Sequence, residues 1–306
     1  MLSYILKRLL LTVPILLIVV TLVFFLLRLV PGDPVDFILG ENALPEAREQ
    51  LVKVHHFDES IDRQYLSYLT GVSKGDFGAS YFSESSVSTL VAQRLPATVE
   101  LAVAALLWAM AISFPAGMLA AIKAGGQTDR AVRFGTLLGV SMPGFYLGPL
   151  LALVFAIKLD WLPLSGRELP GSLILPSLTL GLALSALLTR LVRSTLLEVL
   201  YKDYVRTARA KGLSPTIVIV KHAFRTALVP VVAVMGLQLG ALLTGAVVTE
   251  KIFNWPGLGT LLLEAVSKRD YAVVQGCVLT IAAIYAGVNL LTDTCYAWLD
   301  PRVRVK

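Results

Sequence analysis

The chain has 306 residues, of which 56% are hydrophobic and 16% are charged, and its formal net charge is +6. This composition is too apolar for an ordinary soluble domain and indicates a membrane protein. The lysines and arginines stand in short clusters beside apolar segments and form no extended basic face. The net charge therefore indicates membrane topology and not a nucleic-acid partner.

Cysteine and histidine usage gives no sign of a bound metal. Cys277 and Cys295 stand at opposite ends of one apolar stretch, about 27 Å apart along a helix, so they cannot bridge each other. The three histidines, His55, His56 and His222, do not cluster with cysteines or carboxylates at metal-ligand spacing. We therefore expect the chain to bind no metal.

Six uncharged stretches are each close to the ~20 residues that cross a bilayer. These stretches are residues 9–27, 101–122, 134–157, 169–189, 226–249 and 271–292. Lys7 and Arg8 precede the first stretch as they would precede a secretory signal, but the run is long and no small-residue cleavage site follows it. The sequence thus predicts an all-α membrane protein with six transmembrane helices, the first of which stays as an anchor.

The loop charges predict the orientation of these helices. The loop 123–133 carries three basic residues against one acid, and the loop 190–225 carries eight against two, so both should face the cytoplasm together with the two termini. The long connection 31–99 then lies on the other side of the membrane. Its turn signal at 75–78 and its weakly helical stretch at 45–70 predict a small ordered cap.

No catalytic site can be assembled from the sequence. It has no phosphate-binding loop of the G-x-x-x-x-G-K-[ST] type, no His-Glu pair of a metalloprotease and no histidine within a predicted span. The spans also lack the ionisable residues that proton-coupled and sodium-coupled transporters use. Their polar residues include Gln238, Thr244, Thr280 and Asn289, which we expect either to hydrogen-bond between helices or to contact a substrate. Energy for any transport must therefore come from another chain.

The loop between the fourth and fifth spans predicts a helix–turn–helix unit. Residues 194–211 contain no glycine or proline and are rich in helix formers. Gly212 suits the end of that helix, and Pro215 suits the start of the next one. A short helix of this kind can sit in a cleft of a partner subunit and transmit rigid-body motion.

This loop resembles the EAA coupling motif of permease subunits in bacterial ATP-binding-cassette importers, with the motif glycine at Gly212 and the closing proline at Pro230. Arg206-Thr207-Ala208 stands in place of Glu-Ala-Ala, a substitution that is usual in the peptide-permease branch. The likeness to the dipeptide/oligopeptide/nickel permease family extends over essentially the whole chain. Further segments that carry it are residues 29–34, 75–78, 141–143, 253–259, 269–271 and 300–302.

The resemblance implies a type I importer permease in the bacterial inner membrane. Its expected parts are an N-terminal transmembrane helix at 1–30, an extracytoplasmic segment at 31–99, a five-helix permease core at 100–298 with its coupling loop at 199–228, and a cytoplasmic tail at 299–306. The resemblance assigns ATPase coupling to Asp203, Tyr204, Arg206, Thr207, Ala208, Lys211, Gly212 and Pro230. Residues expected to line the pathway or its gate are Gln238, Thr244, Trp255 and Asn289, with an interfacial aromatic anchor as the alternative role of Trp255.

The resemblance also implies the partners. They are a second related permease subunit, two ATPase subunits that bind ATP and magnesium, and an extracytoplasmic substrate-binding protein, while this chain binds no cofactor and is no enzyme. The expected function is uptake of short peptides by alternating access. A nickel, metal-chelate or glutathione importer is the alternative within the family, and a channel or membrane scaffold that works without an ATPase is the alternative outside it.

Overall fold

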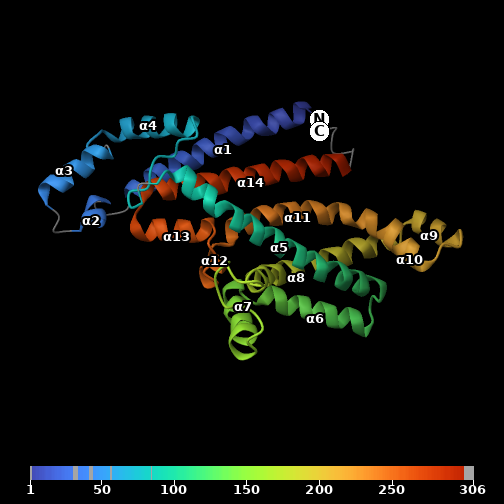
Figure 1. Cartoon of the computed structure of the whole chain (residues 1–306). Coiled ribbons are helices and arrows are strands. Elements are labelled where there is room, and N and C mark those ends of the chain that lie inside the picture. The colour runs from blue at the N-terminus through green and yellow to red at the C-terminus, as the bar shows by residue number, and fades with distance from the viewer. Residues whose placement is uncertain (1, 30–33, 41–43, 56, 84, 300–306) are drawn as a thin grey trace. The chain divides into compact units, whose positions relative to one another are not determined.

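The computed structural model describes residues 2–29, 34–40, 44–55, 57–83 and 85–299, and these form helices joined by short loops (Figure 1). Within these ranges there is no β-strand, and the one β-type pairing is an isolated bridge between Ala79 and Ser86. The predicted all-α fold is therefore confirmed.

The chain divides into two compact units. Unit 1 comprises Met1–Ile5, Val99–Trp255 and Tyr285–Lys306, and unit 2 comprises Leu6–Thr98 and Pro256–Ile284. Unit 2 holds most of α1 (Leu2–Leu29), with α2 (Pro34–Leu39), α3 (Pro45–Val54), α4 (Ile61–Ser73) and α13 (Leu258–Lys268). The long helices α5 (Val87–Ile122) and α14 (Tyr271–Leu299) contribute a part to each unit. Unit 1 also holds α6 (Gln127–Ser141), α7 (Gly144–Leu151), the π-helical segment η1 (Ala152–Lys158), α8 (Ile174–Leu200), α9 (Asp203–Ala210), α10 (Pro215–Ile217), the π-helical segment η2 (Val218–Phe224), α11 (Arg225–Gly245) and α12 (Val247–Ile252).

Five helical stretches in the described part of the chain are long and apolar enough to cross a membrane. They are Leu10–Leu29, Val87–Ile122, Ile174–Leu200, Pro215–Leu243 and Tyr271–Thr294. Large apolar side chains such as Leu17 on α1 and Leu107 on α5 are exposed on them, as expected of surfaces that face lipid. These stretches correspond to five of the six predicted spans.

The third predicted span, 134–157, is wrong as a straight helix. Its two halves, Gln127–Ser141 and Gly144–Lys158, are bent by 103°, so the described residues hold six candidate spans only if this pair is counted as one. The break falls at Met142, whose backbone is extended, directly before Pro143. A residue before proline is pushed out of the helical region, which is the physical reason for the bend.

The fourth predicted span, 169–189, ends too early. The helix α8 continues through Arg190 and Arg193 to Leu200. The first charge marks the end of the apolar run and not the end of the helix, because arginine is a good helix former. On this last part of α8, Arg193 pairs with the carboxylate of Asp129.

The described part of the connection 31–99 is largely helical. The predicted helical stretch 45–70 consists of α3 and α4, and the turn at 75–78 has left-handed backbone at Gly75 and Gly78. Residues 30–33, which include most of the first motif of the resemblance, lie outside the described residues, as do residues 300–302 of the last one. Asp270 precedes α14 as predicted for a cap, and its Oδ1 accepts a 3.3 Å hydrogen bond from the Val273 N–H.

Each unit has its own apolar core. In unit 1, α8 packs against α6, α7 and α11 (Figure 1). In unit 2, the start of α5 packs with α13 and the first half of α14. The buried apolar residues there include Val87, Val91, Leu258, Leu261, Val273 and Cys277.

Candidate functional site

The loop between α8 and α11 forms the predicted helix–turn–helix. Asp203 lies in the first turn of α9, where the helix dipole favours a negative charge, and Pro215 opens α10. Between the two helices Gly212 has a φ of +75°, which residues with a side chain rarely adopt. Gly212 therefore lies at the turn between α9 and α10, and its role in ATPase coupling stays a prediction.

The predicted helix over 194–211 is broken, because α8 ends at Leu200 and Lys202 has extended backbone. The break has a packing reason. Val205 and Ala208 of α9 are buried in one apolar cluster with Leu196 and Val199 of α8. A straight helix rises 1.5 Å per residue and would carry Val205 and Ala208 beyond the end of α8.

Most of the residues assigned to coupling lie on the exposed side of this loop. These are Asp203, Tyr204, Arg206, Thr207, Lys211 and Gly212. Ala208 differs because its side chain is buried in the chain's own core, and Pro230 lies further along, exposed in α11. Within this chain, Ala208 therefore holds α9 in place and leaves the polar face of α9 open.

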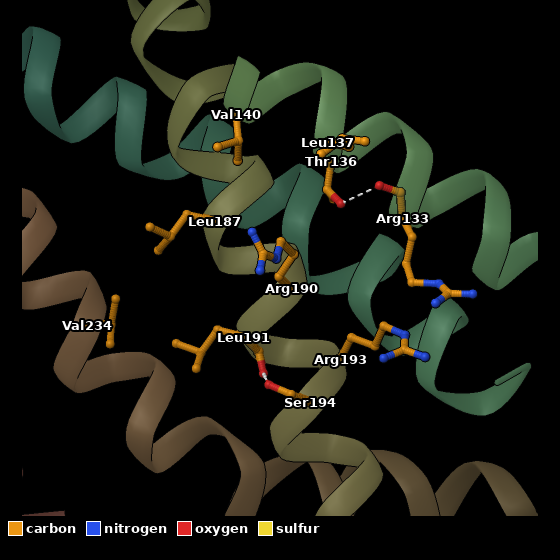
Figure 2. Close-up of a pocket in the computed structure, with 10 residues that line it drawn as sticks. All are labelled: Arg133, Thr136, Leu137, Val140, Leu187, Arg190, Leu191, Arg193, Ser194 and Val234. Atoms are coloured by element: carbon orange, nitrogen blue, oxygen red, sulfur yellow. Dashed lines mark hydrogen bonds between the residues drawn. The ribbon is translucent and has the colours of Figure 1, made fainter. Parts of the chain in front are cut away.

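A basic cavity of about 800 Å³ lies between α6, α8 and α11 in unit 1. Figure 2 shows its apolar wall and three arginines, with Arg133 beside Arg193 and Arg190 turned toward Leu187. Sequence reasoning missed this cavity. The only signal for it was the pair of basic positions, Arg190 and Arg193, directly after the fourth apolar stretch.

Asp129 neutralises one side of this cavity. Its carboxylate is buried and accepts hydrogen bonds from Nε and Nη2 of Arg193 at 2.6 and 2.8 Å, and from the Gly125 N–H at 2.9 Å. Arg133 lies 3.5 Å from the same carboxylate. This bidentate pair joins the start of α6 to α8.

Arg190 is different, because it is exposed and has no carboxylate partner among the described residues. The arginine is always charged in a protein and offers five N–H donors. A positive charge on an apolar wall is therefore available to an anionic group that enters the cavity.

The polar residues expected to line the pathway do not gather at this cavity. Gln238 is half-buried on α11, and the side chain of Thr244 lies outside the described residues. Asn289 lies on α14, and its Oδ1 is buried without a hydrogen-bond partner. A Cβ added at Gly240 would lie 2.9 Å from the Tyr285 ring and 3.8 Å from Asn289 Oδ1, so α11 and α14 approach closely at this point.

Trp255 is buried, with 1% of its surface exposed. The backbone N–H of Trp255 donates a 2.7 Å hydrogen bond to the Glu250 carbonyl, and the guanidinium of Arg167 lies 5.9 Å from the Trp255 ring centroid. An interfacial anchor would expose its ring to the lipid headgroups, so that alternative does not describe Trp255 in this chain. Its assignment to a gate stays a prediction.

The fold and this site define a class, namely multi-pass helical membrane proteins with a polar helical loop exposed between two spans. The sequence model "Binding-protein-dependent transport system inner membrane component" matches residues 113–305, and its N-terminal companion model matches residues 1–102. The chain therefore belongs to the inner-membrane permease family of ATP-binding-cassette importers.

Curated relatives agree over their full length. The chain is 43% identical over 310 residues to the glutathione transport system permease protein GsiC of Salmonella typhimurium, and 42% identical over 306 residues to GsiC of Escherichia coli. Each alignment covers 100% of both chains.

Solved structures share the fold. A subunit of the inward-facing MetNI methionine ABC transporter matches with a TM-score of 0.58 at 18% identity, covering 69% of this chain and 96% of that one. An amino acid ABC transporter with histidines matches with a TM-score of 0.53 at 14% identity, covering 70% and 94%. The type I importer permease fold expected from the resemblance is confirmed.

Proposed function

We propose that this chain forms one half of the membrane pathway of an importer for short peptides, and that a glutathione-like tripeptide is its best-supported substrate. Arg190 carries the proposal, since it presents an unpaired positive charge in a cavity of about 800 Å³. Glutathione and other short peptides carry carboxylates that such a charge would attract. The names of the two relatives also favour glutathione over nickel within the family.

We propose further that the exposed face of α9 docks on an ATPase subunit. Asp203 and Arg206 on this face have 98% and 70% of their side-chain surface exposed, while Val205 and Ala208 anchor the opposite face. An amphipathic helix of this kind can transmit the movement of a partner, because it is firmly attached on one side and open on the other.

The remaining assembly follows the family pattern. The complex would contain a second related permease subunit, two ATPase subunits that bind ATP and magnesium, and a substrate-binding protein outside the membrane. This chain would have no ATPase site, and both of its termini would lie in the cytoplasm, as the basic loops predict. The segment 31–99 would lie outside, and the coupling loop would span residues 199–228.

The test is reconstitution of the purified complex with its binding protein in lipid nanodiscs, followed by measurement of ATP hydrolysis. We expect glutathione or short peptides to stimulate hydrolysis. Stimulation by nickel chelates alone would replace the proposed substrate by the metal alternative. Substrate flux that continues without ATPase subunits would instead support a channel.

The Arg190→Gln variant of the same complex tests the role of the cavity. We expect its KM for an anionic peptide to rise by about tenfold, because the loss of one hydrogen bond to a charged group weakens binding by about this factor. Arg130→Gln is the matched control, since Arg130 is also exposed but does not line the cavity. Equal behaviour of the two variants would remove Arg190 from the pathway.

A further inference from the structure

A second polar cavity, of about 270 Å³, lies wholly within unit 2. It is lined by the end of α1, by the end of α3 and its connection to α4, by α4 and the loop that follows it, and by the start of α14. None of the residues assigned to transport or coupling lines it. The cavity is therefore a feature of the chain that the proposed function does not use.

Two buried donors in this cavity have no partner. Gln275 is 6% exposed, and its Nε2 has no hydrogen bond, while the buried hydroxyl of Tyr68 also has none. Burial raises the pKa of Tyr68 to about 12, so the hydroxyl keeps its proton and remains a donor. Buried polar groups without partners are rare and costly, which indicates that an acceptor belongs here.

Arg28 adds a positive charge to the same cavity. Its guanidinium lies 3.4 Å from the centroid of the Phe24 ring and donates to Gln64 Oε1 at 2.7 Å and to the Phe24 carbonyl at 3.1 Å. Each terminal nitrogen of Arg28 keeps one further N–H, and no carboxylate of the described residues pairs with it. Three kinds of donor thus line one small cavity.

The opposite sign of charge is present as well. Glu59 and Asp76 line the cavity, and His55, Phe57 and Tyr81 form an aromatic wall in which the His55 and Tyr81 ring centroids are 4.6 Å apart. Two carboxylates would repel a multiply charged anion such as phosphate. They would instead favour an ammonium group, which aromatic faces also attract.

We propose that this cavity binds a small free zwitterion, an amino acid or a dipeptide, with its carboxylate on Arg28, Tyr68 and Gln275 and its ammonium group toward Glu59 and Asp76. The volume limits the ligand to about this size. The site does not depend on ATP hydrolysis or on the substrate of the pathway. It would be an accessory ligand site on the permease itself.

The test measures binding of glycylglycine to the full-length chain in nanodiscs, without binding protein or nucleotide, by saturation-transfer NMR. Glycylglycinamide is the matched probe, because it lacks only the carboxylate. We expect glycylglycine to bind and glycylglycinamide to bind at least about tenfold more weakly. This comparison needs no variant and so does not depend on whether a substitution folds.

Two variants assign the binding to this cavity. Tyr68→Phe removes one donor and keeps the ring, and we expect affinity to fall by about tenfold. Tyr65→Phe is its control, because the Tyr65 hydroxyl lies 2.7 Å from Thr21 Oγ1 and does not line the cavity. Both variants are compared in the Arg190→Gln background, because the basic cavity of unit 1 is itself proposed to take peptide carboxylates.

Several results would overturn the proposal. Glycylglycine could fail to bind, both probes could bind equally, or Tyr68→Phe and Tyr65→Phe could have equal effects. Each of these results would mean that the cavity holds water and not a zwitterion. Displacement of the probe by phosphatidylethanolamine added to nanodiscs of phosphatidylcholine would assign the cavity to a lipid headgroup instead. Because the Tyr68→Phe and Tyr65→Phe variants are compared in the Arg190→Gln background, failure of the transport proposal would not change that comparison.

Discussion

Gly212 has a backbone conformation that favours glycine, and no neighbouring side chain crowds it. Its φ is +75°, and a Cβ added there would meet nothing within 4 Å. The need for glycine is therefore a need of the backbone alone, since left-handed backbone costs other residues roughly 1–2 kcal/mol. This strain would fall on the turn that sets α9 and α10 relative to each other.

We predict that Gly212→Val leaves the complex assembled but abolishes substrate-stimulated ATP hydrolysis. Gly166→Val is the matched control, because Gly166 has a φ of +86° and equally open surroundings but lies outside the coupling loop. Size-exclusion chromatography of the complex and an ATPase assay check both variants. Full transport by Gly212→Val, or equal loss in the two variants, would contradict the coupling role.

At the scale of elements, one buried carboxylate joins two helices. Asp129 lies in the first turn of α6, has 1% of its side chain exposed and binds Arg193 of α8, whose side chain is 23% exposed. Removal of one partner from such a pair leaves the other without its counter-charge. Asp129 pairs with Arg193 and Arg133 of the basic cavity. No carboxylate of the described residues pairs with the third arginine of this cavity, Arg190.

We predict that Asp129→Asn lowers the free energy of unfolding by roughly 1.5–3 kcal/mol, the usual value of hydrogen bonds to a charged group. Partial exposure of Arg193 should bring the loss toward the lower value. Denaturant unfolding of the purified chain in detergent measures it. Glu198→Gln, which breaks the exposed pair with Lys202, should cost under about 0.5 kcal/mol, and an equal effect of the two changes would refute the prediction.

At the scale of the whole molecule, the distribution of charge predicts which loops lie on which side of the membrane. The segments 123–133 and 190–225 are basic, and apolar stretches separate them from the segment 31–99. Positive residues are retained on the cytoplasmic side during insertion. The exposed face of α9 would then lie where an ATPase can reach it.

We predict that a membrane-impermeant maleimide labels Lys74→Cys in intact spheroplasts and labels Lys211→Cys only after permeabilisation. Both positions are exposed. The unmodified chain, with its native Cys277 and Cys295, measures the background. The reverse pattern would invert the orientation and place the coupling loop out of reach of a cytoplasmic ATPase.

Sequence by itself determined the fold class, five of the six spans and the turn at Gly212. Each of these depends on a local property, such as the length of an apolar run or the conformational freedom of one glycine. The break before Pro143 also depends on a local property, the effect of a proline on the residue before it. The apolar run continues on both sides of Pro143, and for this reason the sequence predicted a single span there. The coupling assignments of Asp203 and Arg206 came from the resemblance and stay predictions.

Only the tertiary structure decided what depends on residues far apart in the chain. Asp129 and Arg193 are 64 positions apart, and nothing in either local sequence shows that they pair. The same holds for the burial of Ala208 and Trp255, which the local sequence around each residue does not show. Burial and charge pairing depend on which helices pack against each other. The basic cavity around Arg190 and the polar cavity around Gln275 are each formed by several helices, so only the tertiary structure shows them.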